Sequence, residues 1–178
     1  MAGNNFRIAA LLAAISCAAV FRLVPHPPNF SPIAAMALFS GAYLPRRALA
    51  FAAPLAALFL SDLVLGFYPG IAFVYASVAL TVVIGWAIST KRSAPRIASA
   101  AVAGSVLFYV LTNFGTWLTT DMYPKTIEGL AACYVAAIPF FQNTLAGDLV
   151  FTALLFGVFA AAERAIPRLR EVPQPQLA

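Results

Sequence analysis

Charged side chains are scarce in this sequence. Of its 178 residues, 10% are charged and 62% are hydrophobic, whereas soluble domains average about 25% charged residues. This composition excludes a water-soluble globular fold. Cysteine and histidine are also rare. Cys17 and Cys133 lie far apart and form no CxxC pair or metal-ligand spacing, so we expect no metal centre and no cofactor.

Catalytic and nucleotide-binding motifs are missing as well. There is no HExxH zinc motif, no glycine-rich P-loop, and no serine or cysteine at motif spacing from His26. We therefore do not expect an enzyme. The net charge of +5 does not indicate nucleic-acid binding, because the basic residues sit in small groups between apolar runs.

Long apolar runs occupy most of the chain. A helix of about 20 apolar residues crosses a bilayer, and the sequence predicts six spans, at residues 6–23, 31–44, 48–67, 70–89, 96–118 and 143–163, of which the second is short. A shorter run at 127–140 predicts an amphipathic helix before the sixth span. We predict an all-α integral membrane protein, with one transmembrane domain at 1–166 and a disordered cytoplasmic tail at 167–178.

Basic residues divide unevenly between the two faces of this predicted bundle. With both termini in the cytoplasm, nine of the eleven basic residues face inward, and only Arg22 and Lys125 face outward. The positive-inside rule predicts this asymmetry. A seventh span at 127–140 would move the C-terminal arginines to the wrong face, so we predict six spans.

Polar side chains within the predicted spans gather near their outer ends. A charged side chain in hydrocarbon costs about 2.5–3.5 kcal/mol, so each one requires a partner or a wet site. Arg22 is the natural partner of Asp62 or Asp148, and these three residues form either a structural ion pair or part of a substrate site. The pattern predicts an outward-facing pocket that binds a solute through Arg22, His26, Asn29, Asp62, Asn113, Trp117, Asn143 and Asp148.

The neutral candidates also have structural explanations. His26 fits a hydrogen-bonding turn residue, and Asn29 fits a cap of the second helix. Asn113 fits a hydrogen bond between helices, and Trp117 fits the interfacial aromatic belt. The loop at 25–32 contains four prolines in eight residues, which restrict its backbone and predict a rigid lid over the pocket.

Three segments resemble known proteins: residues 22–32 (RLVPHPPNFSP), 60–67 (LSDLVLGF) and 113–117 (NFGTW). They resemble an uncharacterised family of bacterial membrane proteins regarded as transporters. The six-helix arrangement resembles the substrate-binding S components of energy-coupling factor (ECF) vitamin transporters. In S components a small-residue stripe on the first helix docks on a coupling subunit. The resemblance implies this role for Ala10, Ala14 and Ala18, which otherwise fit ordinary helix packing.

We therefore predict a membrane-embedded subunit that binds a small polar, vitamin-like solute and takes part in its uptake across the bacterial cytoplasmic (inner) membrane. Its expected partners are the solute, the lipid bilayer and a coupling transmembrane subunit with ATPases, and no nucleic acid. The alternative is a non-transport scaffold or assembly subunit of a larger membrane complex. A scaffold has no need to collect its polar groups in one external cavity.

Overall fold

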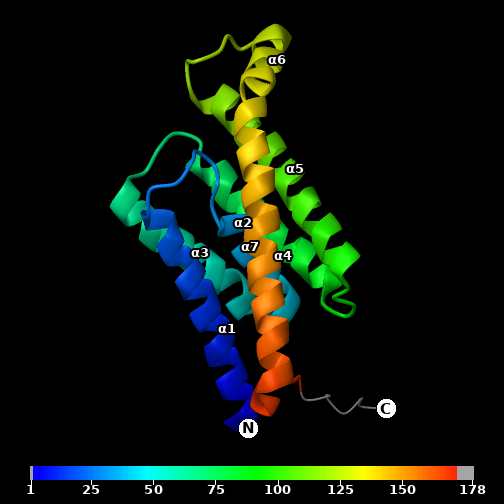
Figure 1. Ribbon diagram of the computed structural model, residues 1–178. Coiled ribbons are helices and arrows are strands. Elements are labelled where there is room, and N and C mark those ends of the chain that lie inside the picture. The colour runs from blue at the N-terminus through cyan, green and yellow to red at the C-terminus, as the bar shows by residue number, and fades with distance from the viewer. Residues whose placement is uncertain (1, 172–178) are drawn as a thin grey trace.

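The computed structural model describes residues 2–171, which form helices joined by loops and contain no strand (Figure 1). The α-helices are α1 (Ala2–Val20), α2 (Ile33–Tyr43), α3 (Arg47–Leu65), α4 (Ile71–Ile88), α5 (Ala94–Thr119), α6 (Ile127–Ala136) and α7 (Ile138–Ala165). Two 3₁₀ turns follow α1 and α7, at Phe21–Leu23 and Pro167–Leu169. Five of these helices are long and apolar enough to cross a membrane, which is compatible with a multi-pass membrane protein.

The helix α2 is shorter than the span predicted at 31–44. It has 11 residues, about 16 Å at 1.5 Å per residue, whereas a hydrocarbon core is about 30 Å thick. Pro32 precedes it and Pro45 follows its C-cap, and both prolines oppose a longer helix. Ten of its residues are buried, because α2 lies inside the bundle against α3, α4 and α7. The count of six spans stays a prediction.

The boundary between α6 and α7 also differs from the predicted one. We expected Pro139 to end the helix at 127–140 and the next span to begin at residue 143. Instead α6 ends at Ala136, and Pro139 lies in the first turn of α7. Proline is tolerated there, since the first-turn N–H groups have no helical acceptor. The apolar helix α7 therefore reaches 28 residues.

Two glycines let α2 and α4 pack with their backbones in contact. A Cβ atom on Gly41 would lie 2.1 Å from the carbonyl oxygen of Val82, and one on Gly85 would lie 2.4 Å from that of Leu38. Neither site has room for a larger residue. Such small-residue contacts are the usual way in which helices associate within lipid.

A hydrogen bond from α2 compensates for the proline inside α3. Pro54 has no N–H, so the carbonyl of Ala50 loses its normal helical donor. The hydroxyl of Ser40 donates to that carbonyl at 2.5 Å, and both residues are fully buried. This hydrogen bond connects α3, near its internal proline, to the buried helix α2.

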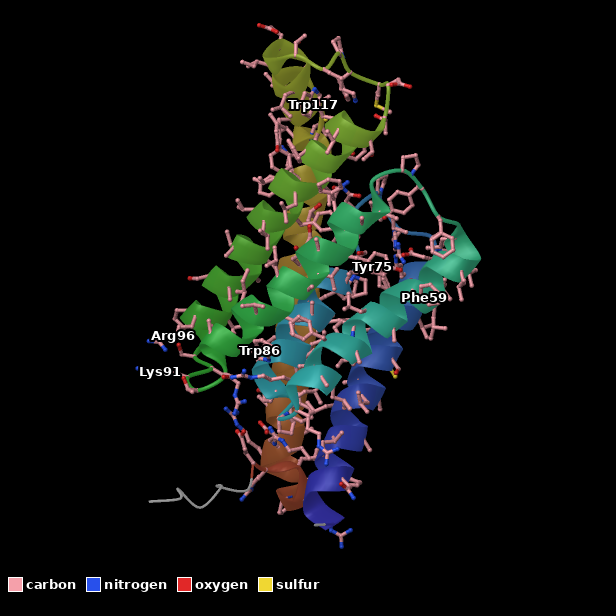
Figure 2. All side chains as sticks on the ribbon, turned by 180° about the vertical axis from the view of Figure 1, so that it is seen from behind. Phe59, Tyr75, Trp86, Lys91, Arg96 and Trp117 are labelled. Carbon is pink, nitrogen blue, oxygen red and sulfur yellow. The ribbon has the colours of Figure 1, made fainter. Side chains whose placement is uncertain are left out.

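The start of α1 and the end of α7 lie at the same end of the molecule, which we call the terminal end (Figure 1). Lys91 and Arg96 lie toward this end, whereas Trp117 lies at the opposite end, which we call the far end (Figure 2). This arrangement brings the loops with most basic residues to one side of the bundle. Which side faces the cytoplasm stays a prediction.

Packed side chains join α1, α2 and α7 at the terminal end. Tyr43 of α2 packs edge-on against Phe159 of α7, with ring centroids 5.0 Å apart, and Arg7 lies over both rings. Arg7 also pairs with Glu163 and donates to the carbonyl of Leu169. Leu169 is buried, so the first residues of the predicted disordered tail are folded against α1. Residues 172–178 of that tail lie outside the described part of the chain.

Candidate functional site

A cavity of about 440 Å³, here called the first lobe, lies beneath the loop that follows α1. A second lobe of about 370 Å³ extends toward the junction of α6 and α7. The two lobes share five lining residues, Asn29, Tyr68, Val74, Phe108 and Thr144. They therefore adjoin, and we refer to them together as the two-lobed cavity.

Arg22 connects this cavity to a buried polar network. Its Nη1 atom lies 2.6 Å from Oδ1 of Asp62 and also donates to the Ser61 hydroxyl. Asp62 is fully buried and does not line the cavity. Its other oxygen accepts the hydroxyl of Tyr75 at 2.9 Å, and Figure 2 shows Tyr75 where α4 passes α3. Asp62 thus holds the Arg22 side chain in position, and only Arg22 of this pair lines the first lobe.

Asp148 contributes the second charged side chain of the first lobe. It is only 3% exposed, and Oδ2 accepts a hydrogen bond from the Ser105 hydroxyl of α5 at 2.6 Å. Within the described chain, Asp148 belongs to no ion pair. Thr144 lies one turn earlier on α7 and lines both lobes. Arg22 therefore pairs with Asp62, and no described basic side chain pairs with Asp148.

The loop at 25–32 covers the first lobe and is fixed to α7. The N–H of Phe30 donates to the carbonyl of Pro27 at 3.0 Å, and Asn29 has a positive φ of 64° within this turn. Asn143 donates its side-chain amide to the carbonyl of Pro28 at 3.0 Å. Asn143 itself does not line either lobe. Its structural role is to hold the loop in place.

His26 and Asn29 both line the first lobe. The His26 ring stacks on Phe21 with centroids 5.9 Å apart, and its buried Nε2 has no hydrogen-bond partner among the described residues. Asn29 does not cap α2, because Pro32 occupies the N-cap position and no side chain bonds there. The cap explanation for Asn29 is therefore wrong.

Of the two candidate site residues on α5, Asn113 lines the cavity and Trp117 does not. Asn113 lines the second lobe, and its amide donates to the carbonyl of Tyr109 one turn earlier, at 2.8 Å. Trp117 lines neither lobe. Its Nε1 donates to the carbonyl of Pro124 at 2.9 Å, and Lys125 lies over its ring. Trp117 thus stabilises the loop before α6 and does not contribute to the cavity wall.

The sequence profile of a family of unknown function, DUF6580, matches residues 3–169. The chain belongs to this family. The match includes every residue that lines the two lobes, so the cavity lies within the family's shared region. Comparison with curated proteins finds no match. Comparison with solved structures also finds none.

Sequence reasoning missed several residues at the site of this DUF6580 protein. Tyr68 and Phe108 line both lobes, and Ser105 holds Asp148. Burial and, to a smaller extent, the charge of Asp62 raise the pKa of the Tyr68 hydroxyl above its ordinary value. One signal was available for Thr144, since it precedes Asp148 by four residues and shares its helix face.

The alanine stripe lies away from the cavity, in a different part of the DUF6580 bundle. Ala10, Ala14 and Ala18 are half-buried and line an apolar groove of about 460 Å³. The other wall of the groove comes from α7, through Leu154 and Val158 among others. The stripe therefore faces α7 across an unfilled apolar space.

Proposed function

We propose that this DUF6580 protein is a membrane-embedded subunit that captures a small polar solute and takes part in its uptake. The observation that carries the proposal is the two-lobed cavity. It collects Arg22, His26, Asn29, Asn113 and Asp148 from segments far apart in the sequence. Polar groups within apolar helices are expensive in lipid, so their convergence on one cavity supports a binding role.

The size and lining of the cavity support the same reading. Small-molecule sites have volumes of about 300–1,000 Å³ and combine apolar walls with a few polar groups. The lobes measure about 440 and 370 Å³. Their walls mix apolar side chains such as Val74 and Phe108 with the polar side chains named above.

Passage to the other side requires a second conformation. Neither lobe reaches the terminal end, where the Tyr43 and Phe159 rings and the Arg7–Glu163 pair join α1, α2 and α7. A ligand shifts such an equilibrium only by its difference in affinity for the two states. The sequence has no nucleotide-binding motif, so we propose that a coupling transmembrane subunit with ATPases drives release.

The proposal extends to topology and location. We propose six membrane passes, with α2 as the short second pass, and both termini in the cytoplasm of a bacterium, in its inner membrane. The division of basic residues supports this orientation. We propose that the groove beside Ala10, Ala14 and Ala18 receives the coupling subunit.

Native mass spectrometry of the detergent-purified protein tests the proposed function. We expect a mass increase from one co-purified small molecule, which is lost on mild collisional activation. A protein that is purely apo, and that gains no mass when incubated with a polar extract of bacterial cells, would instead favour the scaffold function.

A further inference from the structure

We propose that the solute carries a cationic nitrogen group and that Asp148 is the counter-ion of this group. This inference rests on the proposed function and specifies the class of the solute. It follows from the charge balance of the cavity, from the hydrogen bonding of Asp148, and from the neutral lining of the second lobe.

One carboxyl group of the first lobe, that of Asp148, has no basic partner among the described residues. The first lobe is lined by one arginine and one aspartate, Arg22 and Asp148. The guanidinium of Arg22 is already neutralised by Asp62 at 2.6 Å. No described lysine, arginine or histidine forms an ion pair with Asp148. A solute with a positive charge supplies the missing partner, whereas an anionic solute meets a carboxylate of the same sign.

Asp148 is oriented for this contact. It is 97% buried, Oδ2 is held by the Ser105 hydroxyl at 2.6 Å, and the side chain borders the first lobe. Ser105 is fully buried, and its Oγ also lies 3.1 Å from the carbonyl oxygen of Ala101. Oδ1 has no donor among the described residues. A cationic N–H group at Oδ1 forms a charge-assisted hydrogen bond, which is stronger than a neutral one.

The second lobe indicates what the rest of the solute is like. Its lining contains no charged residue and combines aromatic side chains with neutral polar ones, including Phe108, Tyr109, Phe141, Thr112 and Asn113. Aromatic faces accept both apolar rings and cations. The cavity therefore fits a small organic cation with a neutral ring-bearing body that extends from the first lobe into the second.

A bare metal ion fits the site less well. Among the described residues, no group of three or more His, Cys, Asp or Glu side chains is placed to hold a metal. One carboxylate and one hydroxyl supply too few oxygen ligands for Mg²⁺ or Ca²⁺. An organic cation needs only the single carboxylate and the surrounding apolar wall.

Thermal unfolding with charge-sorted extracts tests the inference. A polar extract of bacterial cells is divided on ion-exchange resins at pH 7 into cationic, neutral and anionic fractions. Each is added to the purified protein, to Asp148→Asn, and to Asp121→Asn as a matched control. Asp121 lies in the exposed loop after α5, outside both lobes. We expect the cationic fraction to raise the Tm of the protein and of Asp121→Asn by several degrees, and not that of Asp148→Asn.

The other outcomes separate the inference from the proposed function. Stabilisation by the neutral or anionic fraction alone would overturn the cationic class but leave solute binding intact. Equal stabilisation of Asp148→Asn by the cationic fraction would overturn the role of Asp148. The same Asp148-dependent shift with sodium chloride alone would make this an inorganic-cation site. No stabilisation by any fraction would contradict the proposed function itself.

A second variant keeps the test decisive if Asp148→Asn does not fold. Ser105→Ala retains the carboxylate but removes the hydroxyl that orients it. We expect the concentration of cationic fraction that gives half of the maximal stabilisation to rise several-fold. An unchanged concentration would contradict the assigned geometry.

Discussion

Arg22 Nη1 lies 2.6 Å from Asp62 Oδ1, and the Asp62 side chain is completely buried. This pair joins the 3₁₀ turn after α1 to α3, and Tyr75 extends it to α4. The contact shows that Arg22 pairs with Asp62 and not with Asp148. Arg22 belongs to a structural ion pair with Asp62 and also lines the cavity, so the ion-pair explanation is confirmed and its contact with a solute stays a prediction.

Removing one partner of this ion pair should destabilise the protein strongly. Asp62→Ala strands the Arg22 charge, and breaking a buried pair typically costs about 3–5 kcal/mol. We expect a large fall in Tm, measured by thermal unfolding in detergent. The double variant Arg22→Met with Asp62→Leu removes both charges and should recover much of the loss. If the loss of stability in the double variant equalled the sum of the losses in Arg22→Met and Asp62→Leu alone, the pairing would be contradicted.

The bond from Ser40 to the Ala50 carbonyl gives a second stability test. Ser40→Ala leaves a fully buried carbonyl without a donor, at a cost of about 1–3 kcal/mol. The double variant with Pro54→Ala restores the helical N–H donor. We expect Ser40→Ala to lower the free energy of unfolding markedly less in the Pro54→Ala background than in the natural sequence. An equal loss in both backgrounds would show that the Ser40 hydroxyl does not replace the helical donor.

The loop at 25–32 should act on binding more than on stability. Replacing Pro27 and Pro28 with glycine adds backbone freedom that must be lost again on each binding event. We expect weaker binding of the stabilising extract fraction with a smaller change in the Tm of the apo protein. Pro45→Gly, in a loop outside both lobes, serves as the control. Unchanged binding with a lowered Tm would make the loop a structural brace.

Reporter fusions test the proposed orientation. Fusions after Arg47, Arg96 and Arg168 should report cytoplasm, and fusions near Asn29 and Lys125 should report the outside. The uneven distribution of basic residues is the physical basis of this expectation. A fusion after Arg168 that reports the outside would rule out the six-pass topology.

The sequence predicted the depth of the cavity residues, meaning their position along the bundle axis, better than the direction in which they face. Apolar run lengths located the long helices, and alternation between them brought Asn113 and Asp148 to one cavity. Depth alone did not decide between Asp62 and Asp148 as the partner of Arg22, because that depends on helix rotation and on packing against neighbouring helices. The same limit explains Trp117, which turns to the Pro124 carbonyl.

The predicted bounds of α2, α6 and α7 differ from those in the structure for another reason. Hydropathy does not distinguish a buried helix from one that faces lipid, because both are apolar. The helix α2 is apolar because it lies inside the bundle, and Pro32 and Pro45 limit its length. Pro139 was misread because proline stops a helix from within but is accepted in its first turn.

The most direct test of the central claim is whether filling the first lobe expels the solute. Ala34 is the one residue of α2 that is not buried, and it lines the first lobe. Native mass spectrometry should therefore be compared for Ala34→Phe and for Val102→Phe, a matched change on the exposed face of α5. We predict that the bound small molecule is lost from Ala34→Phe and retained by Val102→Phe. Equal occupancy in the two folded variants would contradict binding in this cavity.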